Sequence, residues 1–190
     1  PEMIRMRELV SGGFLGGVPV LLESHWSYDL GDMSYVGPVL GNPEHWVRRL
    51  PGQLFQNIIS HGIARLAEFL DDEITDVNVI SDQSRRLGEM GGADVKDELR
   101  VLIRDIKGST ALFSFSTQIK PGLNELRVYG PANSLVVDVA SGSVLRARGR
   151  SYKSYLTFLI PALINAWESL GNFMRNFFNL ARQRLYQDSG

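Results

Sequence analysis

The sequence predicts an α+β fold, with a large, mostly antiparallel open sheet and helices packed on one of its faces. Two observations carry this prediction. Between residues 98 and 139, short runs of alternating apolar and polar residues are separated only by turn residues, which is typical of antiparallel strands. Apolar residues recur at helical spacing over residues 54–70 and 161–186. We expect residues 1–190 to form a single domain.

Composition excludes several classes of protein. Hydrophobic residues make up 44% of the chain and charged residues 22%, as in ordinary globular proteins. The net charge of −1 gives no overall field that would attract nucleic acid or an anionic membrane. Cysteine is absent, which excludes disulfides and thiolate chemistry. The N-terminus does not resemble a signal peptide, and the apolar run at 155–167 is short for a membrane span. We expect a cytoplasmic protein with neither nucleic-acid nor membrane partners.

The first half of the chain alternates regular elements with long connections. Residues 1–10 have a helical apolar spacing that ends at a glycine pair, and residues 18–24 form an apolar, β-branched strand. Residues 25–53 are irregular and rich in Gly, Pro and aromatic residues, and loops of this length usually carry function. The strongest helical period, at residues 54–70, follows this loop.

The second half is predicted to be mostly sheet. The expected strands cover residues 74–80, 98–106, 109–119, 126–129 and 134–139, and a polar connector covers residues 81–94. Tight turns between the last four predict an antiparallel meander. A helix at 161–186 closes the chain, and its apolar stripe is expected to pack on the sheet or on a partner. Its arginines leave a membrane-surface role as the alternative.

Asn57 and His61 are the leading candidates for chemistry. They lie four residues apart on the helix at 54–70, so both side chains project from one face, away from the apolar stripe. A neutral imidazole at His61 could exchange a proton with a substrate hydroxyl or carbonyl. Asn57 does not titrate but could orient His61 or bind a substrate oxygen. The alternative is that this pair satisfies only the backbone of the preceding loop.

The loop at 25–53 supplies candidate substrate-binding residues: Tyr28, Trp46, Arg48 and Arg49. Aromatic rings that cover C–H faces, next to charged groups that bind hydroxyls, are typical of a sugar or polyol pocket. The alternative is a loop held in place by its own aromatic residues.

We predict no cofactor-binding or metal site within the chain. Residues 11–16 come within one residue of the dinucleotide pattern G-x-G-x-x-G, but a helix precedes them and a strand follows, which reverses the required context. His25, His45 and His61 do not have the spacing of metal ligands.

Residues 45–61, His-Trp-Val-Arg-Arg-Leu-Pro-Gly-Gln-Leu-Phe-Gln-Asn-Ile-Ile-Ser-His, resemble the Gfo/Idh/MocA oxidoreductases, the glucose–fructose oxidoreductase and inositol dehydrogenase family. Segments 15–19, 97–101, 126–130 and 134–138 resemble the entry and strands of that family's C-terminal domain. The resemblance implies a parent protein whose N-terminal Rossmann domain binds NAD or NADP. In the family, a helix with Asp-x-x-x-His faces the nicotinamide and the substrate, together with a Lys from a Glu-Lys-Pro motif.

Two departures from this family shape the functional expectation. The Rossmann domain and its lysine motif are missing, with Lys120 elsewhere, and Asn57 stands where the family has Asp. The resemblance therefore implies a substrate-binding and assembly domain of an NAD(P)-dependent oxidoreductase acting on a sugar or polyol CH–OH group. His61 would be the acid/base and Asn57 would orient the substrate. The chain would be inactive and cofactor-free alone, and would form a homo-oligomer through an uncovered apolar sheet face. The alternative is a non-catalytic ligand-binding or scaffold protein on the same fold.

Overall fold

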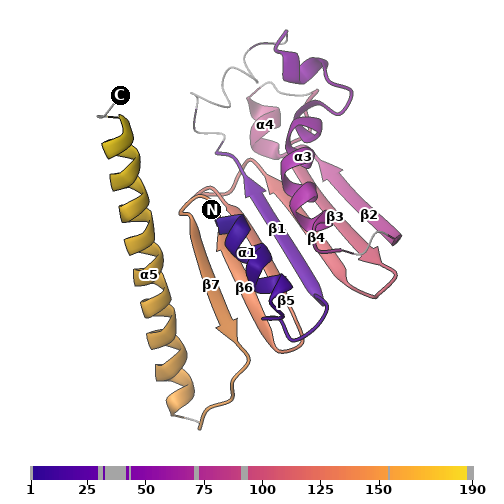
Figure 1. The fold of residues 1–190 in the computed structure, drawn as a ribbon. Coiled ribbons are helices and arrows are strands. Elements are labelled where there is room, and N and C mark those ends of the chain that lie inside the picture. The colour runs from indigo at the N-terminus through magenta and orange to yellow at the C-terminus, as the bar shows by residue number, and fades with distance from the viewer. Residues whose placement is uncertain are drawn as a thin grey trace.

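A seven-stranded sheet forms the centre of the computed structural model, which describes residues 2–29, 32, 42, 44–70, 73–90, 94–153 and 155–187. The strands run in the spatial order β2-β3-β4-β1-β5-β6-β7 (Figure 1). In sequence order they are β1 (Leu21–Ser27), β2 (Ile74–Asp82), β3 (Glu98–Asp105), β4 (Thr110–Ser116), β5 (Asn124–Tyr129), β6 (Asn133–Asp138) and β7 (Ser143–Arg148). The helices are α1 (Glu2–Ser11), the 3-10 helix η1 (Trp46–Arg49), α3 (Gln53–Ala67), α4 (Arg85–Glu89) and α5 (Leu156–Gln187). This confirms the predicted α+β class.

The predicted meander is interrupted at its middle. Strand β1 lies between β4 and β5, parallel to β4 and antiparallel to β5. The strands β3 and β4 form one antiparallel pair, and β5, β6 and β7 form a three-stranded meander. Tight turns predicted that consecutive strands pair, but the turn after β4 instead crosses over the end of β1. Strand β1 fills the gap, and its residues precede their partners in β4 by 89 positions, which local sequence does not reveal.

Helices α1 and α3 pack on the same face of the sheet, as Figure 1 shows. Alternation along the strands places the buried side chains on that face, among them Leu22 and Ser24 of β1 and Phe113 and Phe115 of β4. Helix α3 contacts β1 and β4, whereas α1 contacts β6 and β7. The prediction of helices on one face is therefore confirmed.

Several predicted boundaries differ from the structure. The first strand is Leu21–Ser27 instead of 18–24, so His25 and Trp26 belong to the sheet and not to the irregular loop. The connector at 81–94 contains α4, which Ser84 caps by accepting a hydrogen bond from the backbone N–H of Leu87 at 3.1 Å. Strand β7 was not predicted, and its burial alternation is weak because it is an edge strand. Of the irregular loop, residues 30, 31, 33–41 and 43 lie outside the described residues.

The opposite face of the sheet, called here the helix-free face, carries no helix among the described residues. It is less apolar than the sequence led us to expect. Tyr129 donates a hydrogen bond to Glu23 at 3.0 Å, and Arg127 donates one to Glu125 at 2.8 Å. Burial, and then the hydrogen bond to Glu23, raise the pKa of Tyr129. Charged pairs therefore alternate there with apolar residues such as Leu112 and Val136.

Helix α1 is tied to the residue that follows α3. Arg7 donates two hydrogen bonds to Glu68, from Nε at 2.7 Å and from Nη2 at 2.9 Å. The hydrogen bond from Arg7 is the largest cause of a lowered pKa at Glu68. The pKa of Glu68 is lower in the folded protein than in the unfolded chain. The ion pair therefore stabilises the fold at pH values above the unfolded-state pKa, and this stabilisation is lost as pH falls through the folded-state pKa.

We expect Glu68→Gln to lower the free energy of unfolding slightly at pH 7, and we expect this loss to shrink as pH falls through the lowered folded-state pKa of Glu68. Urea unfolding of both proteins at pH 7 and at pH 3 measures this difference. Glu89→Gln is the control, because Glu89 pairs with Arg85 on an exposed helix. An equal loss at both pH values would contradict the ion-pair explanation.

Candidate functional site

The candidate site is centred on α3, which approaches the sheet very closely. Gly62 allows this approach: a Cβ atom built there would lie 2.0 Å from Cε2 of the buried Phe113. Ser24 of β1 also donates a hydrogen bond to the carbonyl of Gly62 at 3.3 Å. The residue beside Gly62 is His61, so the backbone that carries the candidate acid/base is fixed against the middle of the sheet.

His61 lies on Trp26 of β1. The two rings stack with their centroids 5.7 Å apart and an interplanar angle of 29°. Arg65, one turn further along α3, places its guanidinium over the same indole at 5.0 Å and donates a hydrogen bond to Asn124 at 2.6 Å. Burial lowers the pKa of Arg65. Trp26 therefore positions two side chains of one helical stripe.

That stripe begins at Asn57, because residues 57, 61 and 65 follow one another at intervals of four along α3. Asn57 is half-buried, whereas His61 is exposed. The predicted pair thus shares a helix face, and that face meets the sheet where β1 ends. An exposed imidazole backed by an aromatic ring can exchange protons with a bound hydroxyl while keeping one orientation.

Tyr28 joins the same aromatic cluster. Its ring meets Trp26 edge-on at 6.4 Å and Phe115 edge-on at 5.8 Å. The next residue, Asp29, forms an ion pair of 2.7 Å with Lys120. Lys120 therefore lies beside the aromatic cluster.

The remaining predicted residues belong to η1, which contacts α3. Trp46 is 59% exposed and its ring lies 5.9 Å from that of His45. Arg48 pairs with Asp94, and this hydrogen bond is the main cause of the lowered pKa of the Asp94 carboxyl. Arg49 pairs with Glu44. Both arginines have a carboxylate partner, so their predicted role in binding substrate stays a prediction.

The structure therefore brings Tyr28 and His61 together around Trp26, and it adds Arg65, which the sequence reasoning did not select. Arg65 could have been found from its spacing, because it stands four residues after His61. Spacing could not have shown that Trp26 stacks on His61. This contact depends on β1, which extends to Ser27 and so beyond the predicted end of the strand at residue 24.

The glycines at residues 12–16 have a structural role. Gly16 has a φ of +79°, and a Cβ atom there would lie 2.5 Å from Cβ of Ala132. They form the turn from α1 to β1, which is the reverse of the strand-to-helix turn that holds a dinucleotide. Residues 12–16 therefore do not form the strand-to-helix turn that binds a dinucleotide.

The three histidines do not converge. Alternation along β1 places His25 on the helix-free face, 4.0 Å from Glu23, whereas His61 lies on the other face. The Nδ1 atom of His45 accepts from the backbone N–H of Val47 at 3.4 Å. Among the described residues, no three His, Asp or Glu side chains gather in a metal-binding arrangement.

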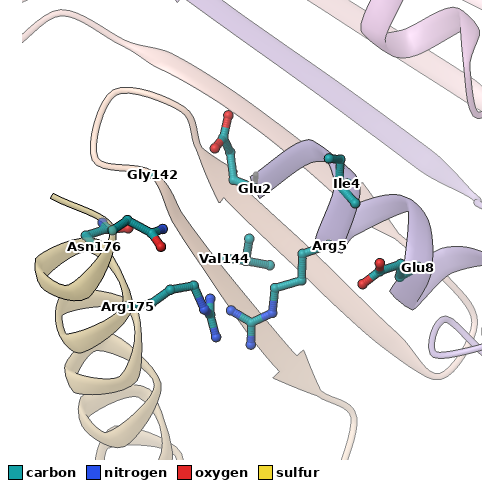
Figure 2. A pocket seen from close by; sticks show the side chains of 9 residues that line it. Glu2, Ile4, Arg5, Glu8, Gly142, Val144, Arg175 and Asn176 are labelled. Carbon is teal, nitrogen blue, oxygen red and sulfur yellow. The ribbon is translucent and has the colours of Figure 1, made fainter. Parts of the chain in front are cut away.

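A separate cavity of about 360 Å³ lies between α1, β7 and α5 (Figure 2). Arg5 of α1 and Arg175 of α5 point toward each other in it, and both donate to Asn172, at 3.1 and 3.4 Å. Burial is the first cause of the lowered pKa of Arg5, followed by the charge of Arg175. This cavity is remote from His61, and it shows that α5 meets the domain through polar groups.

In the part of the chain that the structure describes, no helix has the length and apolar character required to cross a bilayer.

No protein-family model and no curated protein sequence matches this chain. Solved structures do match. An inositol dehydrogenase homolog from Azotobacter vinelandii aligns with a TM-score of 0.62 and 16% identity over 79% of this chain and 39% of its own. The aldose-aldose oxidoreductase of Caulobacter crescentus gives 0.60 and 18%, over 78% and 42%. The WlbA dehydrogenase of Bordetella pertussis gives 0.57 and 12%, over 80% and 44%.

These neighbours are oxidoreductases of the Gfo/Idh/MocA type. The chain spans about two fifths of the length of each. At this level of identity the likeness concerns the fold, and it agrees with the fold that the resemblance of residues 45–61 implied. The chain therefore has the fold of one part of the Gfo/Idh/MocA-type oxidoreductases.

Proposed function

We propose that this chain is the C-terminal substrate-binding and assembly domain of an NAD(P)-dependent oxidoreductase that acts on a CH–OH group of a sugar or polyol. The observation that carries the proposal is the position of His61, on an exposed helical stripe beside Trp26, in a fold shared with sugar and polyol dehydrogenases. We further propose that the parent protein is cytoplasmic and forms a homo-oligomer through the helix-free face.

In this proposal the chain supplies the proton transfer. Oxidation of a carbinol requires that its hydroxyl lose a proton, and the imidazole of His61 is the group on this stripe that can accept it. Asn57 would hold the substrate oxygen, since an amide donates and accepts hydrogen bonds without titrating. Tyr28, Trp46, Arg48 and Arg49 would line the pocket. The nicotinamide would be held by a Rossmann domain outside this chain.

The test is the turnover of the full-length protein that contains this chain. It is measured as the reduction of NAD(P)⁺ with each member of a panel of sugars and polyols. We expect His61→Ala to lower kcat by about 100-fold, the usual effect of losing a general base. His25→Ala is the matched control, because His25 lies on the opposite face of the sheet. Unchanged turnover in His61→Ala, or an equal loss in both variants, would remove His61 from the mechanism.

Asn57 favours a second candidate, a non-catalytic protein that binds sugars or polyols on the same fold. An amide at this position cannot take part in acid/base chemistry as a carboxylate can. Under this alternative the wild-type protein binds members of the panel in calorimetry, and none of them reduces NAD(P)⁺.

A further inference from the structure

Helix α5 is amphipathic, and its polar side faces its own domain. In most surface helices it is the apolar side that faces the core. Glu168 accepts from the backbone N–H and from Nε of Arg146, both at 2.7 Å. Asn172 donates to the carbonyl of Val144 at 3.0 Å, and Asn176 donates to that of Ser141 at 2.7 Å. These polar residues lie at intervals of four, so they define the side of α5 that faces β7 and its preceding turn.

Most large apolar residues of α5 lie on the other side, and several of them stand in a regular order. They follow one another at alternating intervals of three and four, and we call them the α5 seam: Ile160, Leu163, Trp167, Leu170, Met174, Phe177 and Ala181. This spacing averages 3.5 residues, the repeat by which one helix packs along another in a coiled coil. At 1.5 Å per residue the seam is about 32 Å long.

The seam is exposed to solvent from Leu163 to Phe177. Leu163 is 60% exposed, Trp167 66% and Phe177 54%. Beside the seam, Phe173 and Phe178 are 60% and 55% exposed. An aromatic side chain can bury about 150–250 Å², so the four aromatic residues alone leave roughly 400 Å² in water. The largest apolar patch of a soluble monomer is commonly of this size and is often a functional contact surface.

We propose that the α5 seam packs against the α5 seam of a second copy of this chain. A seam with a 3.5-residue repeat needs a helix of similar length as its partner. Among the described residues, α1 has 10 residues and α3 has 15, and both contact the sheet of their own domain. Only α5 among them carries the matching repeat, and a two-fold axis pairs a surface with itself.

The placement of Arg175 argues against a lipid surface as the occupant. A helix that lies on an anionic membrane borders its apolar side with Lys and Arg that face the headgroups. On α5, Arg175 instead turns into the cavity beside Arg5 (Figure 2). The positions next to the seam are small or apolar, among them Leu159 and Ala166, which suits packing of a second helix.

Because the chain has no cysteine, a single introduced cysteine tests this pairing directly in the full-length protein. Leu170 lies at the middle of the seam, so Leu170→Cys comes close to its counterpart in both parallel and antiparallel pairs. We expect a disulfide-linked dimer on mild oxidation of Leu170→Cys, and none for Ser169→Cys, which is exposed but off the seam. Absence of the cross-link in Leu170→Cys, or equal cross-linking in both, would overturn the proposal.

Sedimentation over a range of concentrations gives the second test. We expect Trp167→Glu to weaken association by at least about 100-fold, as burial of a charge in an apolar seam requires. Phe158→Glu should leave association unchanged, because Phe158 is 82% exposed on the same helix but outside the seam. Equal effects of the two variants would overturn the proposal. So would a wild-type protein that binds anionic vesicles through Trp167 and remains unassociated in their absence.

This inference does not depend on the proposed function. An oligomer formed through the helix-free face should be weakened by Leu112→Glu, and the α5 cross-link should persist in that variant. The activity of His61 is a third, separate measurement.

Discussion

Replacing Gly62 with alanine is expected to destabilise the protein by about 3 kcal/mol, at the upper end of the range for overpacking a core. The added Cβ atom would lie 2.0 Å from Cε2 and 2.6 Å from Cζ of Phe113, and Phe113 is fully buried. Because the ring has no free space to enter, either α3 moves away from β4 or Phe113 leaves its position. Urea unfolding at pH 7 measures the loss.

The matched control is Gly171→Ala in α5. Apart from the adjacent residues and the backbone of α5 itself, no atom of this chain lies within 4 Å of the Cβ position there, so alanine should stabilise the helix by up to about 1 kcal/mol. The two substitutions are chemically identical and differ only in what the methyl group meets. Phe113→Leu in the Gly62→Ala background should cost less than the two single substitutions together, since it removes the clash. Additive losses, or a neutral Gly62→Ala, would contradict the packing described here.

Replacing Asp97 with alanine is the second substitution with a large expected effect, a loss of about 3 kcal/mol or more. The carboxylate is fully buried and accepts hydrogen bonds from the backbone N–H and the hydroxyl of Ser84, both at 2.6 Å, and from the hydroxyl of Thr117. Alanine would leave three buried donors without this acceptor, and each unsatisfied group costs about 1–3 kcal/mol.

Asp97 also organises the end of the sheet near the candidate site. Through Ser84 it holds the first turn of α4, and through Thr117 it holds the residue after β4. Asp76→Ala is the control, because Asp76 accepts a hydrogen bond from Asn78 on an exposed strand and should change stability by less than about 0.5 kcal/mol. Thermal unfolding compares the two, and a similar shift in both would show that the Asp97 contacts contribute little.

Periodicity predicted the elements whose burial is one-sided. The helix at 54–70 and the strands around Leu99–Ile103 and Ala111–Phe115 were found because one face of each packs into the core. Strand β7 was missed because an edge strand buries little, and α4 because five residues are too few to show a period. The pairing of β1 with β4 and β5 links residues about 90 and 105 positions away, and no local pattern contains that information.

The candidate site also has one part that spacing predicted and one part that it did not. Spacing alone placed Asn57 and His61 on one face of one helix. The structure agrees, because residues four positions apart in an α-helix lie on the same face. The residues predicted from the loop had no such constraint. Arg48 and Arg49 are paired with Asp94 and Glu44, and Asp94 stands 46 positions after Arg48, a distance that no local pattern covers.

By itself, the sequence determined the α+β class, the main helices and the polar pair on α3, since these follow from hydrophobic periodicity within each element. Only the tertiary structure decided that β1 enters the middle of the sheet, that Trp26 supports both His61 and Arg65, and that α5 turns its apolar seam outward. The physical reason is common to all three. Amphipathicity shows that a helix or strand has two different sides, and only long-range contacts decide which neighbour each side meets.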